Sequence, residues 1–247
     1  MKRVLILGGT GDGAELVNQV SNLPNIEVIT SLAGRTREPQ APSGLFRIGG
    51  FGGELGLISY LRTEKIDVLI DATHPFASEI SRNAASAAIA CNLPHLMLIR
   101  PVWQPVGGDN WIEVETVAAA AENLPEFAQR VFLTIGRQQL ASFAHLDNIW
   151  FLMRLIDPPP ANSAIPQGKI LRDRGPFTLE NELKLLQDHQ IDTLVSKNSG
   201  GDATYAKIIA ARELGIPVVM VKRPPTPPGN QVNDVPSAVV WLLNHLE

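Results

Sequence analysis

A glycine-rich segment directly after the first apolar run constrains the fold of this chain more than any other feature. Val4–Leu7 is aliphatic and β-branched, which is typical of a buried strand, and residues 8–14 then read Gly-Gly-Thr-Gly-Asp-Gly-Ala. Asp12 and Glu15 stand three residues apart, as at a capped helix start, and predict a helix through residue 20. From its second glycine the segment satisfies G-x-G-x-x-A between a strand and a helix. This pattern favours nucleotide binding over a plain glycine turn capped by Asp12.

Strand-like and helix-like stretches alternate along the rest of the chain. The expected strands are Val4–Leu7, Ile26–Thr30, Leu45–Ile48, Val68–Ile70, Leu96–Ile99, Val131–Ile135, Ile149–Leu155, Thr193–Val195 and Val218–Val221. The expected helices are 12–20, Leu55–Arg62, Ser78–Ala90, Val117–Leu124, Gln138–Phe143, Leu179–Gln187, Ala203–Leu214 and Pro236–Leu246. Such alternation predicts an α/β protein with mainly parallel sheets. We expect two Rossmann-like doubly wound lobes with a cleft between them, and a single continuous sheet is the alternative.

The composition of the sequence changes after Pro101. Residues 105–110 are rich in proline, glycine, aspartate and asparagine, which is typical of a linker. We therefore assign residues 1–106 to an N-terminal dinucleotide-binding domain and residues 107–247 to a C-terminal α/β substrate-binding domain.

Composition excludes several classes of protein. A net charge of −4 argues against non-specific nucleic-acid binding, which depends on excess lysine and arginine. The single cysteine, Cys91, excludes an intrachain disulfide framework and a cysteine-rich metal site, and we expect no metal. No apolar run approaches the roughly 18 residues of a membrane-spanning helix, so we expect no membrane partner and a cytoplasmic location. The sequence does not indicate an oligomeric state.

In open parallel sheets, ligands bind beyond the carboxyl ends of the strands, so the loops at those ends are informative. The loop after the second strand reads Ser31-Leu32-Ala33-Gly34-Arg35-Thr36. An NAD site usually carries an acidic residue here, whereas two hydroxyls and a guanidinium suit the 2′-phosphate of NADPH. An exposed loop arginine is the alternative interpretation.

Two further loops follow strands of the first lobe. Gly49-Gly50-Phe51-Gly52-Gly53 fits the close approach of a ligand and a mobile turn equally well. Asp71-Ala72-Thr73-His74 follows the fourth strand, where a nicotinamide would lie, and His74 could donate a hydrogen bond or a proton there. The other interpretation is that Asp71 and Thr73 cap the next helix and that His74 is merely exposed.

The second lobe supplies cations at the corresponding ends of its strands. Arg137 follows one strand, and Lys197-Asn198-Ser199-Gly200-Gly201 follows another, with Thr204 and Lys207 one helical turn onward. Arg172 and Arg174 lie in a loop between them, although Asp173 could simply neutralise both. Because the chain is acidic overall, cations gathered in these loops suggest an anionic ligand.

Five of these motifs, taken together and in their order along the chain, resemble the precorrin-6A reductase and cobalt-precorrin-6A reductase family of cobalamin biosynthesis. They are Gly8-Gly9-Thr10, residues 31–36, residues 49–53, residues 71–77 and residues 197–201, and the likeness continues through Arg223-Pro224. The resemblance implies an NADPH-dependent oxidoreductase that transfers a hydride to the C18=C19 bond of the precorrin-6A macrocycle, giving precorrin-6B. The partner it implies is a small-molecule anionic tetrapyrrole.

Loop position and this resemblance together give each motif an expected role. The cofactor-binding residues are expected to be Gly9, Thr10, Gly11, Asp12, Ser31, Arg35, Thr36, Gly50, Thr73 and His74. The substrate-binding residues are expected to be Arg137, Lys197, Asn198, Ser199, Gly200, Gly201 and Thr204. His74 and Lys197 are the catalytic candidates, because either could donate the proton that must follow the hydride, as could solvent.

Two other functions compete with this hypothesis. A protein that binds NADPH without catalysis, and so reports the redox state to a partner, would need the nucleotide loops but not the cations of the second lobe. A short-chain dehydrogenase or epimerase acting on a nucleotide sugar generally needs Tyr-x-x-x-Lys. Here Tyr60 and Tyr205 are followed at that spacing by Glu64 and Ile209, which disfavours this class.

Overall fold

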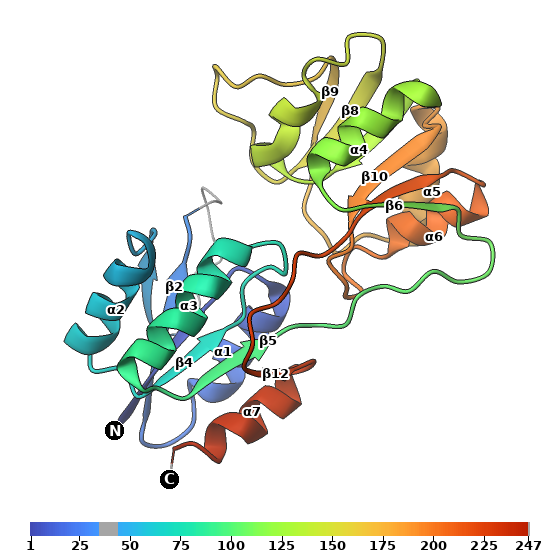
Figure 1. Ribbon diagram of the computed structural model, residues 1–247. Helices are drawn as coiled ribbons and strands as arrows, with labels where there is room; N and C mark the ends of the chain where they lie inside the picture. The colour runs from blue at the N-terminus through green and yellow to red at the C-terminus, as the bar shows by residue number, and fades with distance from the viewer. Residues whose placement is uncertain (35–43, 247) are drawn as a thin grey trace. The chain divides into compact units, whose positions relative to one another are not determined.

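The computed structural model describes residues 1–34 and 44–246 and divides into two compact units (Figure 1). The first unit combines Met1–Pro101 with Pro224–Glu247, and the second is Val102–Arg223. Each unit is an α/β domain with its own parallel sheet, as the alternation of strands and helices predicted.

Within its described residues, the first unit holds a six-stranded sheet in the order β12-β5-β4-β1-β2-β3, with every neighbouring pair parallel. Its strands are β1 (Lys2–Leu7), β2 (Ile26–Leu32), β3 (Leu45–Ile48), β4 (Val68–Asp71), β5 (His95–Leu98) and β12 (Asn230–Val232). Its helices are α1 (Gly11–Val20), α2 (Gly53–Thr63), α3 (Ser78–Cys91) and α7 (Val235–Leu243).

Alternating side chains of β1 supply the two apolar layers of this unit. Val4 and Ile6 pack with α1 and α7 on one face of the sheet, and Leu5 and Leu7 pack with α2 and α3 on the other. Burial on both faces explains why the central strands read as continuous aliphatic runs in the sequence. The arrangement leaves the carboxyl ends of β1, β2, β3 and β4 along one edge of the sheet.

The second unit, all of whose residues are described, has the sheet order β6-β11-β10-β7-β8-β9, again with parallel neighbours. Its strands are β6 (Trp111–Val114), β7 (Arg130–Thr134), β8 (Trp150–Leu155), β9 (Gly168–Arg172), β10 (Thr193–Lys197) and β11 (Val218–Val221). Its helices are α4 (Val117–Asn123), α5 (Leu179–Asp188), α6 (Ala206–Glu213) and the 3₁₀ helices η1 (Leu124–Glu126) and η2 (Arg137–Phe143). Helices α5 and α6 share one apolar cluster with β7 and β10.

Both sheets follow the strand order 3-2-1-4-5-6 of dinucleotide-binding folds, but the strands in the sixth positions are exchanged. Strand β6 follows β5 in the chain and yet pairs with β11, whereas β12 follows β11 and pairs with β5. Helix α7 then packs its buried Ala238 and Leu242 in the cluster that contains α1 (Figure 1). The assignment of residues 107–247 to a second domain is therefore wrong for residues 224–246, and the first boundary lies at residue 101.

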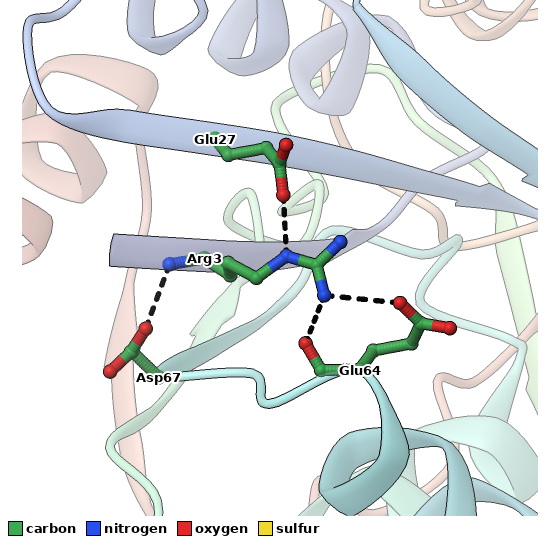
Figure 2. A network of polar contacts seen from close by, with 4 residues as sticks. All are labelled: Arg3, Glu27, Glu64 and Asp67. Carbon is green, nitrogen blue, oxygen red and sulfur yellow. Dashed lines mark hydrogen bonds and ion pairs between the residues drawn. The ribbon is translucent and has the colours of Figure 1, made fainter. Parts of the chain in front are cut away.

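An arginine near the chain start joins the amino-terminal ends of three strands (Figure 2). The Arg3 guanidinium donates to the Glu27 carboxylate of β2, and to both the carbonyl and the carboxylate of Glu64 just after α2. The backbone N–H of Arg3 donates to Asp67 Oδ2 at 2.8 Å, directly before β4. This network lies at the edge of the sheet opposite the glycine-rich loop, so its role is to hold the fold.

Three strands of the structure, β6, β9 and β12, were missed by the sequence analysis. All three are sheet edges, and their residues are largely half-exposed or exposed, so no apolar run marks them. Helix α6 also begins at Ala206 rather than at Ala203. Within the described part of the chain, no helix combines the length and apolarity that crossing a membrane requires.

Candidate functional site

The β1–α1 loop is organised by Thr10 rather than by Asp12. Thr10 is the N-cap of α1, and its hydroxyl accepts a hydrogen bond from Gly13 N at 3.0 Å. The same hydroxyl donates to the carbonyl of Ala72, after β4, at 2.8 Å. Thr10 therefore ties the two loops together, and the interpretation of Asp12 as the helix cap is wrong.

The glycines of this loop fit the pyrophosphate of a dinucleotide. Gly9 has a φ of +124°, and a Cβ built on it or on Gly11 meets no described atom within 4 Å, so the backbone there is open to a ligand. At Gly13 a Cβ would lie 3.2 Å from the Cβ of Ala72, so the missing side chain lets α1 pack closely against the chain just after β4. Open backbone at a helix start and a close helix–strand contact are both features of dinucleotide sites.

Asp12 lies in the first turn of α1, where a carboxylate would compete with a bound anion. It forms an ion pair with Arg100, with 3.3 Å between Asp12 Oδ2 and Arg100 Nη1. The arginine offsets the carboxylate charge, which removes the electrostatic objection to an anionic ligand at this helix start.

Arg47 on β3, which was not predicted as a site residue, links the carboxyl end of β2 to the loop after β3. Arg47 donates to Ser31 Oγ at 2.8 Å, to Gly49 O at 3.0 Å and to Gly50 O at 3.0 Å. Its guanidinium lies 3.9 Å from the centroid of the Phe51 ring. Ser31 and Gly50, two of the residues expected to bind the cofactor, thus both bond to Arg47, whereas Arg35 and Thr36 lie outside the described residues.

The loop after β4 holds His74 in a defined position. Thr73 donates to the buried Asp71 Oδ1 through its N–H at 3.0 Å and its hydroxyl at 2.6 Å. His74 is half-buried, and its Nδ1 accepts from Phe76 N at 3.2 Å. Neither Asp71 nor Thr73 caps α3, which follows Ala77, so that interpretation of the loop is wrong. Because β4 is the neighbour of β1, this loop borders the glycine loop.

In the second unit, Asn198 joins the β10–α6 loop to the segments that enter and leave the unit. Its amide accepts from Trp103 N at 2.8 Å and donates to Trp103 O at 3.0 Å, and its own N–H donates to Val221 O at 2.9 Å. Arg223 Nε donates to the Asn198 carbonyl at 3.4 Å. The buried amide therefore holds the loop in its conformation and is not directed at a ligand.

The remaining predicted substrate residues lie along the same edge of the second sheet. Lys197 ends β10, and Arg137 begins η2 just after β7, the strand that pairs with β10. The Arg137 guanidinium donates a hydrogen bond to Pro158 O at 3.3 Å. Gly201 O accepts one from the indole N–H of Trp103 at 2.9 Å. Ser199, Gly200 and Thr204 belong to the same β10–α6 connection.

Lys207 was named with the cations of this loop, but the structure buries it in a cluster of charges with Arg154 and Glu182, which were not predicted. Arg154 on β8 pairs with Glu182 on α5 through contacts of 2.6 and 3.0 Å, and the two side chains are 7% and 1% exposed. Lys207 on α6 is 5% exposed and donates to Thr204 O at 3.0 Å. Burial first, and then the Arg154 charge, lower the pKa of Lys207 to about 7, against an opposing effect of Glu182.

Comparisons with known proteins agree with this architecture. The family described as precorrin-6x reductase CbiJ/CobK matches residues 3–243. A precorrin-6A reductase of Rhodococcus erythropolis is 49% identical over 243 residues, and one of Mycobacterium tuberculosis is 44% identical over 243 residues, each match covering 98% of both chains. The solved structure of a CobK precorrin-6A reductase superposes with a TM-score of 0.93 at 39% identity, covering 99% of this chain and 97% of that one. The chain therefore belongs to the precorrin-6x reductase family, and it is an oxidoreductase.

Proposed function

We propose that the protein reduces one carbon–carbon double bond of precorrin-6A, or of its cobalt-containing counterpart, with NADPH as the cofactor. Family membership over residues 3–243 supports the substrate. The observation that carries the cofactor is the β1–α1 loop, where open glycine backbone follows a buried strand and begins α1. That combination suits the pyrophosphate of a dinucleotide.

The first unit would hold the cofactor through groups on the carboxyl ends of its strands. The backbone of Gly9 and Gly11 would face the pyrophosphate, while Ser31, Arg35 and Thr36 would surround the ribose with its 2′-phosphate. When bound, NADPH would supply the hydride that reduces the C18=C19 bond, giving precorrin-6B. Thr73, held by Asp71, would fix the loop that carries His74 beside the nicotinamide.

The second unit would bind the substrate through its cations. Precorrin-6A carries many acetate and propionate carboxylates, which Arg137 and Lys197 would pair with. Ser199 and the backbone of Gly200 and Gly201 would donate further hydrogen bonds. We assign Asn198 a positioning role, because its amide is bound to the main chain of Trp103. The proton that follows the hydride would come from His74, Lys197 or solvent.

The purified protein, mixed with NADPH and precorrin-6A, tests the function directly. We expect loss of nicotinamide absorbance together with formation of the reduced macrocycle. NADPH binding without oxidation in the presence of the substrate would instead indicate a nucleotide-sensing protein.

Arg35→Ala is expected to weaken NADPH binding much more than NADH binding. The guanidinium would contact only the 2′-phosphate, which NADH lacks. Dissociation constants for both nucleotides, measured by titration calorimetry, check this. Equal losses for the two nucleotides would remove Arg35 from the phosphate site.

Lys197→Ala is expected to raise the KM for precorrin-6A and to leave the dissociation constant of NADPH nearly unchanged. The reason is that Lys197 ends β10 in the second unit, whereas the glycine loop belongs to the first. Initial rates at saturating NADPH and a separate NADPH titration provide the two measurements. A defect confined to NADPH affinity would reverse the assignment.

A further inference from the structure

Arg47 carries a positive charge that hydrogen bonds hold in place and that no carboxylate among the described residues neutralises. It is the third residue of β3 and pairs in register with Ser31, which lies near the carboxyl end of β2. Its three hydrogen bonds to described residues all end on neutral oxygens, those of Ser31, Gly49 and Gly50. Among residues 1–34 and 44–246 no carboxylate forms an ion pair with it.

The surroundings of Arg47 also fix the orientation of its guanidinium. The guanidinium carbon lies 3.9 Å from the centroid of the Phe51 ring and 5.2 Å from that of the Tyr60 ring. These two rings are arranged edge to face, with 5.1 Å between their centroids. A long side chain usually loses conformational entropy when it binds an anion, and here the aromatic rings and two carbonyls have already ordered it.

The geometry of a guanidinium leaves Arg47 with binding capacity. Of its five N–H groups, the two on Nη1 and one on Nη2 have partners within the described part of the chain. The Nε–H and the second N–H of Nη2 have none there. A pair of N–H groups on a guanidinium matches two oxygens of a phosphate.

We infer that Arg47 binds the 2′-phosphate of NADPH and thereby makes the nucleotide site specific for the phosphorylated cofactor. In dinucleotide-binding folds the adenosine ribose lies at the carboxyl end of the second strand, and Ser31, to which Arg47 is bonded, lies at that point. The inference rests on the proposed NADPH dependence and adds a specificity-determining residue outside the loop of residues 31–36.

Arg47→Gln tests the inference with two pairs of probes, NADPH against NADH and adenosine 2′,5′-bisphosphate against AMP. We expect the variant to lose about 10- to 100-fold in affinity for each 2′-phosphorylated probe, as for a lost hydrogen bond to a charged group, and to keep its affinity for NADH and AMP. Arg47→Lys, which keeps the charge, should retain part of the preference. Arg62→Ala, which removes a positive charge from α2 away from this loop, should change none of the four affinities.

The outcomes separate this inference from the proposed function. Equal losses for phosphorylated and unphosphorylated probes would show that Arg47 only shapes the Gly49–Gly53 loop and would overturn the inference, and so would unchanged affinities. A wild-type protein that binds NADPH and NADH equally would overturn the inference and leave a reductase that accepts either nucleotide. A wild-type protein that binds neither nucleotide would overturn the proposed cofactor, and the inference with it.

Discussion

Glu182→Ala is expected to lower the free energy of unfolding of the second unit by about 3–5 kcal/mol. Glu182 is 1% exposed and meets Arg154 through two hydrogen bonds, of 2.6 and 3.0 Å. The Arg154 guanidinium also lies 3.9 Å from the centroid of the Phe177 ring and 4.7 Å from that of Phe132. Removing the carboxylate leaves a guanidinium buried among aromatic rings with no counter-ion from the described part of the chain, close to the buried Lys207.

Urea unfolding followed by tryptophan fluorescence is suited to this measurement, because Trp103, Trp111 and Trp150 all belong to the second unit. Glu213→Ala, at the exposed end of α6, is the matched control and should change the free energy of unfolding by less than about 0.5 kcal/mol. Exchanging both partners, Arg154→Met with Glu182→Leu, should restore much of the stability, since the Arg154 charge is then no longer left without its carboxylate. A single variant as stable as the wild type would contradict the expectation.

The free energy of unfolding is expected to rise with pH between about 7 and 10 because of Lys207. The folded protein holds this lysine at a pKa of about 7, whereas the unfolded chain titrates it at the ordinary value of 10.5. Between these values the unfolded state binds the extra proton, so raising the pH favours the folded state by up to about 1.4 kcal/mol per pH unit. Below pH 7 both states carry the proton and this contribution to the slope disappears.

Lys207→Met isolates this effect from the other groups that titrate in the same range. The free energy of unfolding of the variant should exceed that of the wild type by the largest amount at pH 6, where the wild type buries a charge. The difference should shrink by about 4 kcal/mol by pH 10. Urea unfolding of both proteins at several pH values provides the comparison, and parallel pH curves would show that Lys207 does not titrate differently in the folded state.

Much of the fold followed from the sequence because the central strands are buried on both faces. Val4–Leu7 and Val218–Val221 are aliphatic without interruption, so they stand out from the helices and loops around them. Strands β6, β9 and β12, which lie at sheet edges and are largely half-exposed or exposed, were not predicted, for the opposite reason. In particular, β12 reads Asn-Gln-Val, and nothing in that local pattern indicates that it pairs with β5 rather than with β11.

The candidate site was predictable where a motif is local and was not where it depends on pairing between strands. The glycine loop after β1 lies within seven residues, and its position between strand and helix is confirmed. Arg47 belongs to the candidate site because it lies opposite Ser31 in the sheet. That position depends on how β2 and β3 pair, which the local sequence around Arg47 does not indicate. Asn198 seemed suited to a ligand by its loop, but its amide is taken up by Trp103, ninety-five positions earlier in the chain.

The exchange of β6 and β12 determines when each sheet can be completed during synthesis on the ribosome. In the second unit the strand in the sixth position, β6, is synthesised before all the others, so the sheet can be completed as soon as β11 has emerged from the ribosome. The first unit instead keeps β5 as an open edge until Asn230–Val232 leave the exit tunnel. Although domains nearer the N-terminus usually fold first, here the later-synthesised unit is expected to be finished before the earlier one.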